Sequence, residues 1–284
     1  MSGASPLALS WEVNGLELAG LSWGNPDGRP LLALHGWLDN AASFSVIAPM
    51  LHHHHVVAVD LTGHGLSANR SADATYQIWD DLPELLGVVE ALGWDRFSLM
   101  GHSRGAIICS LLASAAPERV ERLVLLDGVV PEAVGEDEFP AQMRRFLDDK
   151  RHWLRSRNRI YPTVEAALAS RKRSSLPAGA ARALVERNLR PCEGGYTWTT
   201  DLRLRGASAV KLTRGQIHAV LGALSMPTLL LLAQEGFGGR PELARQASRH
   251  IRQLDIVQVS GGHHFHMEPG AAIVAQKING FLQA

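Results

Sequence analysis

The chain has 284 residues, of which 46% are hydrophobic and 20% are charged. This balance excludes a disordered chain and is typical of a single α/β domain that carries an insertion. Lys plus Arg equals Asp plus Glu at 28 residues each, so the net charge gives no reason to expect nucleic acid or an anionic membrane as a partner.

The sequence predicts a cytoplasmic protein. No apolar run reaches the ~20 residues that a membrane span needs, and residues 1–15 lack the basic start and apolar core of a secretory signal. The two cysteines, Cys109 and Cys192, cannot form a disulfide framework and favour a reducing compartment.

Strand and helix patterns alternate along most of the chain. Asn14-Gly15 separates two strand-like runs at 7–13 and 16–23, which predicts a β-hairpin. Short apolar runs, typical of strands buried on both faces, lie at 31–34, 56–59, 97–100 and 123–126, and two further strand candidates lie at 228–232 and 256–259. Helical patterns cover 76–92, 104–116, 241–250 and 271–282. We therefore expect a mostly parallel sheet with helices on both faces.

Four consecutive histidines at 52–55 interrupt this pattern just before the strand predicted at 56–59. Such a run could bind a metal ion. Because no acidic or thiol ligand lies beside it, we expect a solvated loop instead.

Residues 131–212 break the alternation. They are rich in Arg and Glu, and no convincing strand is present. We interpret this segment as a helical cap, inserted between a first core part (1–130) and a second core part (213–284), with its charged runs facing solvent. No internal repeat is present.

Residues 101–105 read Gly-His-Ser-Arg-Gly and lie between a predicted strand and a predicted helix. In this context the Gly-x-Ser-x-Gly motif presents a serine hydroxyl for chemistry. Glycines at 101 and 105 allow neighbouring backbone to approach closely, and the N-terminus of the helix favours developing negative charge. We predict Ser103 as the nucleophile.

A serine nucleophile needs a general base, which we expect on a loop after the last strand. The segment 260–269 reads SGGHHFHMEP and contains three histidines. His263 directly follows the glycine pair and is the predicted base, with His264 and His266 as alternatives. The nearby carboxylates do not complete a metal ligand set, so no metal is expected at this loop.

The base needs a carboxylate to orient it, and two candidates follow predicted strands. Asp127 follows the strand at 123–126 and precedes a glycine. Its position at a strand tip, where the catalytic groups of open sheets gather, makes it the preferred acid. Glu235 follows the strand at 228–232 and remains the alternative acid, although its glycine-rich loop at 236–239 would leave it poorly fixed.

An oxyanion hole needs two N–H groups. The residue after the nucleophile, Arg104, supplies one. We expect the other from Trp37, because Gly36 allows a close backbone approach in the loop after the strand at 31–34. His35 is expected to hydrogen-bond within this loop, and the glycine-punctuated loop at 60–67 is expected to form a structural rim.

Together these segments resemble the α/β-hydrolase fold family over nearly the whole chain. More narrowly, HGWLDNAASF at 35–44 and GGHHFHM at 261–267 are similar to the serine hydrolase-like proteins. The resemblance implies an α/β-hydrolase fold, with Ser103 as nucleophile and His263 as base.

The acid departs from the commonest pattern of that family, which has an aspartate just after the strand at 228–232. The haloalkane dehalogenases are similar to this chain in placing the acid where Asp127 stands. Dehalogenase and epoxide hydrolase activities are not expected, because those relatives use an aspartate where this chain has Ser103.

We therefore expect a serine hydrolase that cleaves a small ester or related acyl substrate through an acyl-enzyme, with no cofactor and no metal. Two alternatives stay open. One is a carbon–carbon bond hydrolase or lyase that uses the same triad, and the other is a binding or receptor protein of this fold with little turnover.

Overall fold

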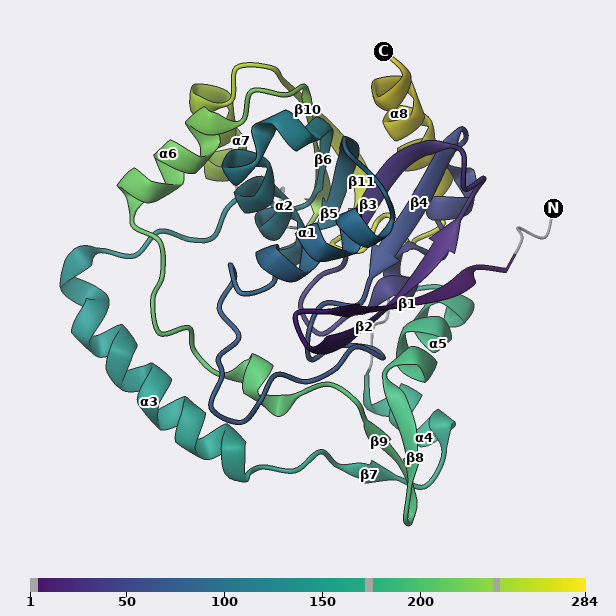
Figure 1. Cartoon of the computed structure of the whole chain (residues 1–284), viewed down its shortest axis with the longest axis vertical. Helices are drawn as coiled ribbons and strands as arrows, with labels where there is room; N and C mark the ends of the chain where they lie inside the picture. The colour runs from purple at the N-terminus through teal and green to yellow at the C-terminus, as the bar shows by residue number, and fades with distance from the viewer. Residues whose placement is uncertain (1–4, 172–175, 237–240) are drawn as a thin grey trace.

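The computed structural model describes residues 5–171, 176–236 and 241–284, and an eight-stranded sheet forms its centre (Figure 1). The strands are β1 (Leu7–Val13), β2 (Leu16–Trp23), β3 (Arg29–Leu34), β4 (His54–Val59), β5 (Phe97–His102), β6 (Val120–Leu126), β10 (Thr228–Glu235) and β11 (Leu254–Gly262). Their order in the sheet is β1-β2-β4-β3-β5-β6-β10-β11. Strand β2 is antiparallel to both of its neighbours, and every other pair of neighbouring strands in this sheet is parallel. The predicted mostly parallel sheet is confirmed.

The predicted hairpin is also confirmed, and it joins β1 to β2. Asn14 and Gly15 have φ values of 53° and 76°, and a two-residue type I′ turn requires a positive φ at both positions. Val13 consequently pairs with Leu16 directly across the turn.

Helices cover both faces of the sheet. One face packs against α1 (Leu82–Ala91), α2 (Arg104–Ala115), α6 (Arg214–Ala223) and α7 (Pro241–His250), and the other packs against α5 (Ala178–Arg187) and α8 (Ala271–Gln283). In β3, Leu32 and Leu34 face the first group whereas Leu31 and Ala33 face the second. Residues 31–34 of this strand are all apolar because both faces of the strand are buried there. In the described part of the chain, no helix combines the length and the apolar character that crossing a membrane requires.

The helix predicted at 76–92 is shorter than expected, because α1 begins only at Leu82. The Asp80 carboxylate accepts hydrogen bonds from the Gln77 N–H at 2.6 Å and from the Thr75 hydroxyl at 3.1 Å. Local side-chain bonds of this kind compete with helix formation. Pro83 then stands in the first turn of α1, where its missing N–H costs nothing.

The expectation of a solvated loop for the histidines at 52–55 is wrong for the second half of the run. His52 and His53 are exposed, but His54 and His55 are buried as the first residues of β4. They pair with Arg29 and Pro30 of β3, and the backbone pairing extends the strand beyond its apolar residues.

Residues 131–212, which we call the insert, lie between β6 and α6. They contain the helices α3 (Phe139–Arg155), α4 (Val164–Ser170) and α5, and Figure 1 shows α3 as a long helix away from the sheet. They also contain three short antiparallel strands, β7 (Ile160–Tyr161), β9 (Gly195–Trp198) and β8 (Leu189–Cys192). The expectation that the insert lacks strands is therefore wrong, because strands of two to four residues are too short to show an alternating pattern.

One buried carboxylate joins the insert to the core. Asp60 follows β4, and its oxygens accept hydrogen bonds from the backbone N–H groups of Ala41 at 2.7 Å and Leu66 at 2.9 Å. Arg187, the last residue of α5, donates to the same carboxylate through Nε at 3.0 Å and lies 2.9 Å from it through Nη2. Asp60 is fully buried, so the insert supplies the positive charge that this core carboxylate needs.

We expect Arg187→Met to lower the free energy of unfolding by about 3–5 kcal/mol, because it leaves the Asp60 charge buried without its partner. The matched control is Arg182→Met on the same helix, whose carboxylate partners Glu165 and Glu186 are exposed; the control should have a much smaller effect, because solvent screens an exposed ion pair. Urea unfolding of both variants measures the difference. Equal effects would show that the buried pair is no more important than the surface pair.

Candidate active site

Ser103 lies at the junction of β5 and α2 in a backbone conformation that is rare for serine, with φ 52° and ψ −115°. Its N–H donates to the Leu126 carbonyl at 2.9 Å. A Cβ atom at Gly105 would overlap the backbone oxygen of Leu34, and one at Gly101 would overlap the backbone of Gly105. The strand, tight turn and helix that the sequence predicts around Ser103 are present, and backbone strain of this kind clusters at functional sites.

Asp127 and His263 meet at the carboxyl edge of the sheet. Asp127 directly follows β6, and His263 directly follows β11. His263 Nδ1 lies 2.6 Å from Asp127 Oδ2, while Asp127 Oδ1 accepts the Ala233 N–H at 3.1 Å. The aspartate side chain is fully buried and the histidine side chain is 28% exposed. A fixed carboxylate at Nδ1 holds the proton on that nitrogen and directs Nε2 elsewhere.

Glu235, the alternative acid, is the last residue of β10 and its side chain is exposed. The neighbouring Gly236 lies against the Asp127 carboxylate, since a Cβ atom at that glycine would overlap Asp127 Oδ2. Most of the glycine-rich loop predicted at 236–239 lies outside the described residues. The structure thus brings Asp127 to the imidazole of His263 and leaves the Glu235 side chain at the surface.

The two alternative bases have other partners. His264 Nε2 lies 3.1 Å from Asp39 Oδ2, and His266 Nε2 lies 2.9 Å from the hydroxyl of Ser43. His266 is fully buried. Of the three histidines of this loop, His263 is the one placed on Asp127.

Ser103 and Asp127 share a pocket of about 400 Å³. Residues 131–133 of the insert line it on one side, and α7 lines it with Glu242, Leu243 and Gln246. The pocket therefore lies between the sheet edge, the start of the insert and α7, and is of a size that holds a small molecule.

The two predicted oxyanion donors lie on segments that run side by side. Arg104 is the first residue of α2, and the start of this helix packs against the backbone of Leu34 and His35 next to Gly105. Trp37 lies in the loop that follows Leu34 and His35, and its indole N–H donates to the Leu204 carbonyl of the insert at 2.9 Å. The N-terminal turn of α2 presents backbone N–H groups that no helical carbonyl can accept.

Two buried histidines beside this loop are neutral. His35 donates from Nδ1 to the Gly36 carbonyl at 2.8 Å and accepts the Leu61 N–H at Nε2 at 3.0 Å, so it hydrogen-bonds within its loop as predicted. Burial lowers the pKa of His35, and burial with the adjacent His35 holds the pKa of His64 well below its usual range.

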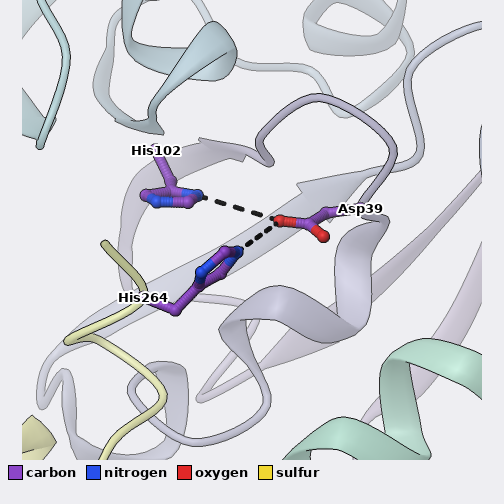
Figure 2. Close-up of side chains that lie close together, drawn as sticks. All are labelled: Asp39, His102 and His264. Atoms are coloured by element: carbon purple, nitrogen blue, oxygen red, sulfur yellow. Dashed lines mark hydrogen bonds and ion pairs between the residues drawn. The ribbon is translucent and has the colours of Figure 1, made fainter. Parts of the chain in front are cut away.

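A polar cluster of Asp39, His102 and His264 lies beside the site, and the sequence did not predict it (Figure 2). His102 is the second residue of the Gly-x-Ser-x-Gly motif, and burial keeps the pKa of its imidazole well below the usual range. Asp39 lies 225 residues before His264. Because this separation is so long, no motif spacing indicates that the two side chains meet.

Comparison with known proteins identifies the same architecture. The sequence pattern of the alpha/beta hydrolase fold family matches residues 29–269. A serine hydrolase-like protein of Danio rerio is 34% identical over 282 residues, which cover 94% of this chain and 85% of the relative.

Solved structures agree with this match. A hypothetical protein of Pseudomonas aeruginosa is 38% identical, with a TM-score of 0.91 over 99% of this chain and 100% of the other. The thioesterase domain from the curacin biosynthetic pathway is 27% identical, with a TM-score of 0.85 over 97% of this chain and 99% of the other.

The neutral state of His35 and His64 predicts that acid destabilises the protein. Their pKa values are lower in the folded chain than the ~6.5 of an unfolded histidine, so the unfolded state binds more protons below that pH. The stability is complete above about pH 6.5 and falls as the pH drops, by up to about 1.4 kcal/mol per pH unit for each histidine.

His64→Asn tests this linkage, because an amide at that position retains a donor for the Thr62 carbonyl that His64 Nδ1 faces at 3.1 Å. The free energy of unfolding, measured in urea at pH 7.5 and pH 5.5, should fall less in the variant than in the wild type. The difference at pH 7.5 gives the pH-independent cost of the substitution. An equal fall in both proteins would contradict the assignment.

Proposed function

The chain belongs to the alpha/beta hydrolase family, in the branch of the serine hydrolase-like proteins, and from this premise we propose that it hydrolyses a small ester or related acyl compound with Ser103, His263 and Asp127. The observation that carries the proposal is the hydrogen bond between the buried Asp127 and His263, at the edge of the sheet where the strained Ser103 also stands.

The first step is attack of the Ser103 hydroxyl oxygen on the carbonyl carbon of the substrate. Asp127 holds the proton of His263 on Nδ1, so Nε2 is the nitrogen that accepts the serine proton as the new C–O bond forms. The imidazolium that results is stabilised by the buried carboxylate and then gives its proton to the leaving group. This produces an acyl-enzyme on Ser103.

The carbonyl oxygen becomes negatively charged during this attack. The backbone N–H groups of Trp37 and Arg104 are the proposed donors to that oxygen, helped by the N-terminal end of α2. Water, deprotonated by His263, then attacks the acyl carbon and releases Ser103. Every step uses side chains, backbone N–H groups and water, so the proposed reaction needs no cofactor.

The pocket supports a small acyl substrate. Its volume of about 400 Å³ and its apolar lining residues Ile107, Val130 and Leu243 suit a short apolar acyl chain. Residues 131–133 line it, so we propose that the insert acts as a cap that selects the substrate. The similar thioesterase domain also acts on an acyl compound. The free cysteines support a cytoplasmic location for the reaction.

Ser103→Ala should abolish hydrolysis of a chromogenic short-chain ester and labelling by a fluorophosphonate probe, because loss of a triad member typically costs several powers of ten in rate. Ser114→Ala, in the helix α2 that follows Ser103, is the matched control and should keep both ester hydrolysis and probe labelling. Labelling that persists in Ser103→Ala would refute the nucleophile. A wild-type protein that is labelled but turns over no ester would favour the carbon–carbon hydrolase or the binding protein.

The two candidate acids can be separated on the same ester. Asp127→Asn should lower kcat by on the order of a hundredfold or more, because an amide at this position favours the wrong tautomer of His263. Glu235→Gln should cost less than about tenfold, since its side chain is exposed at the end of β10. A mild effect of Asp127→Asn together with a severe effect of Glu235→Gln would reverse the assignment.

A further inference from the structure

Asp39, His102 and His264 converge from three separate segments of the chain. Asp39 lies in the loop after β3, His102 ends β5, and His264 follows β11 (Figure 2). Asp39 Oδ2 is 3.1 Å from His264 Nε2 and 4.0 Å from His102 Nδ1, and the three atoms lie within 4.8 Å of one another. Asp39 and His102 are each only 1% exposed.

The hydrogen bond of His102 fixes which of its nitrogens carries a lone pair. Its Nε2 lies 2.8 Å from the carbonyl oxygen of His263, and because a carbonyl only accepts, Nε2 must carry the proton. In the neutral ring, Nδ1 then holds a lone pair, and within the described residues it has no hydrogen-bond partner. A buried acceptor without a partner costs about 1–3 kcal/mol.

This lone pair faces a second acceptor. His102 Nδ1 lies 4.0 Å from Oδ2 of the Asp39 carboxylate. Two electron-rich atoms that face each other in a buried site repel unless a positively charged group or a donor lies between them. Gly36 borders these two atoms, since a Cβ atom there would come 2.9 Å from His102 Nδ1 and 3.2 Å from Asp39 Oδ2. The glycine keeps that side of the cluster free of a side chain.

The donor set selects a class of cation. Two imidazole nitrogens and one carboxylate oxygen suit Zn²⁺ and similar transition-metal ions, whereas Mg²⁺ and Ca²⁺ prefer oxygen ligands. A tetrahedral ion with bonds of about 2.0–2.2 Å needs ligand atoms roughly 3.4 Å apart. The pair of Asp39 and His264 already meets this spacing, and a shift of the His102 ring toward Asp39 would bring in the third ligand.

We propose that Asp39, His102 and His264 form a binding site for a single transition-metal dication of the Zn²⁺ class. The ion coordinates His102 Nδ1, His264 Nε2 and Asp39 Oδ2, replaces the proton that His264 Nε2 shares with Asp39, and leaves a further coordination position for water. His102 directly precedes Ser103 and His264 directly follows His263, so the ion would sit beside the proposed catalytic residues. Its binding does not depend on whether the chain hydrolyses esters.

Zinc titration of the full-length, chelator-treated protein against a competing chromophoric chelator tests the proposal. The wild type should bind one tight equivalent of Zn²⁺. Asp39→Asn and His264→Gln should each weaken that binding by more than about a hundredfold, because even partners outside the coordination sphere contribute about 10–100-fold. Circular dichroism checks that the variants fold.

A matched control excludes surface histidines as the source of binding. His218 stacks on His250 with ring centroids 4.1 Å apart, a pair that could bind zinc adventitiously. His218→Gln should leave the tight equivalent intact. Binding that is lost in His218→Gln and kept in Asp39→Asn, or no tight binding at all, would overturn the proposal.

Crystals of the wild type soaked in Zn²⁺ give a test that does not depend on the folding of any variant. Anomalous scattering at the zinc edge should show a peak between Asp39, His102 and His264. A peak at His218 and His250 only, or water alone between His102 and Asp39, would overturn the proposal.

Discussion

The left-handed backbone of Ser103 is the constraint that organises the carboxyl edge of the sheet. A strained conformation of this kind costs about 1–3 kcal/mol and persists only where its neighbours hold it. Here the Leu126 carbonyl holds the serine N–H, and Gly128 lies so close that a Cβ atom on it would come 2.7 Å from Ser103 O. Asp127, which lies between Leu126 and Gly128 in the chain, also has a positive φ, of 48°. The ends of two adjacent strands therefore hold each other in place, and both Ser103 and Asp127 line one pocket.

Much of the fold is determined by residues that are close together in the sequence, and this is the part that the sequence predicts. Asn14-Gly15 specifies a turn type through two φ angles, and the run at 123–126 is apolar because both faces of its strand are buried. The elbow at 101–105 is readable because a strand, the Gly-x-Ser-x-Gly motif and a helix follow one another directly in the sequence, although the backbone that approaches Gly105 belongs to the distant Leu34. The positions of Asp127 and His263 follow because parallel strands end at one edge of the sheet.

Contacts between distant segments could not be predicted in this way. Nothing local to Asp60 indicates that Arg187 pairs with it, and nothing in the histidine loop indicates that His264 contacts the carboxylate of Asp39. The strands of the insert are too short to show a periodic pattern, and His54 and His55 join β4 through backbone pairing with the distant Arg29 and Pro30. In each of these cases tertiary contacts, rather than intrinsic propensity, determine the local structure.

The ion pair of Asp60 and Arg187 has a consequence for how such inserts diversify. An insert could be exchanged between related proteins by recombination, but the transplanted insert would meet the buried carboxylate of Asp60. If the transplanted insert had no cation at the position of Arg187, at the end of α5, the Asp60 charge would be left unpaired. The recombined protein would then be unstable. Substitutions at residues 131–133, which line the pocket, leave this ion pair intact, whereas a substitution of Arg187 at the end of α5 removes it. The lining of the pocket can therefore change in evolution while the contact between insert and core stays the same.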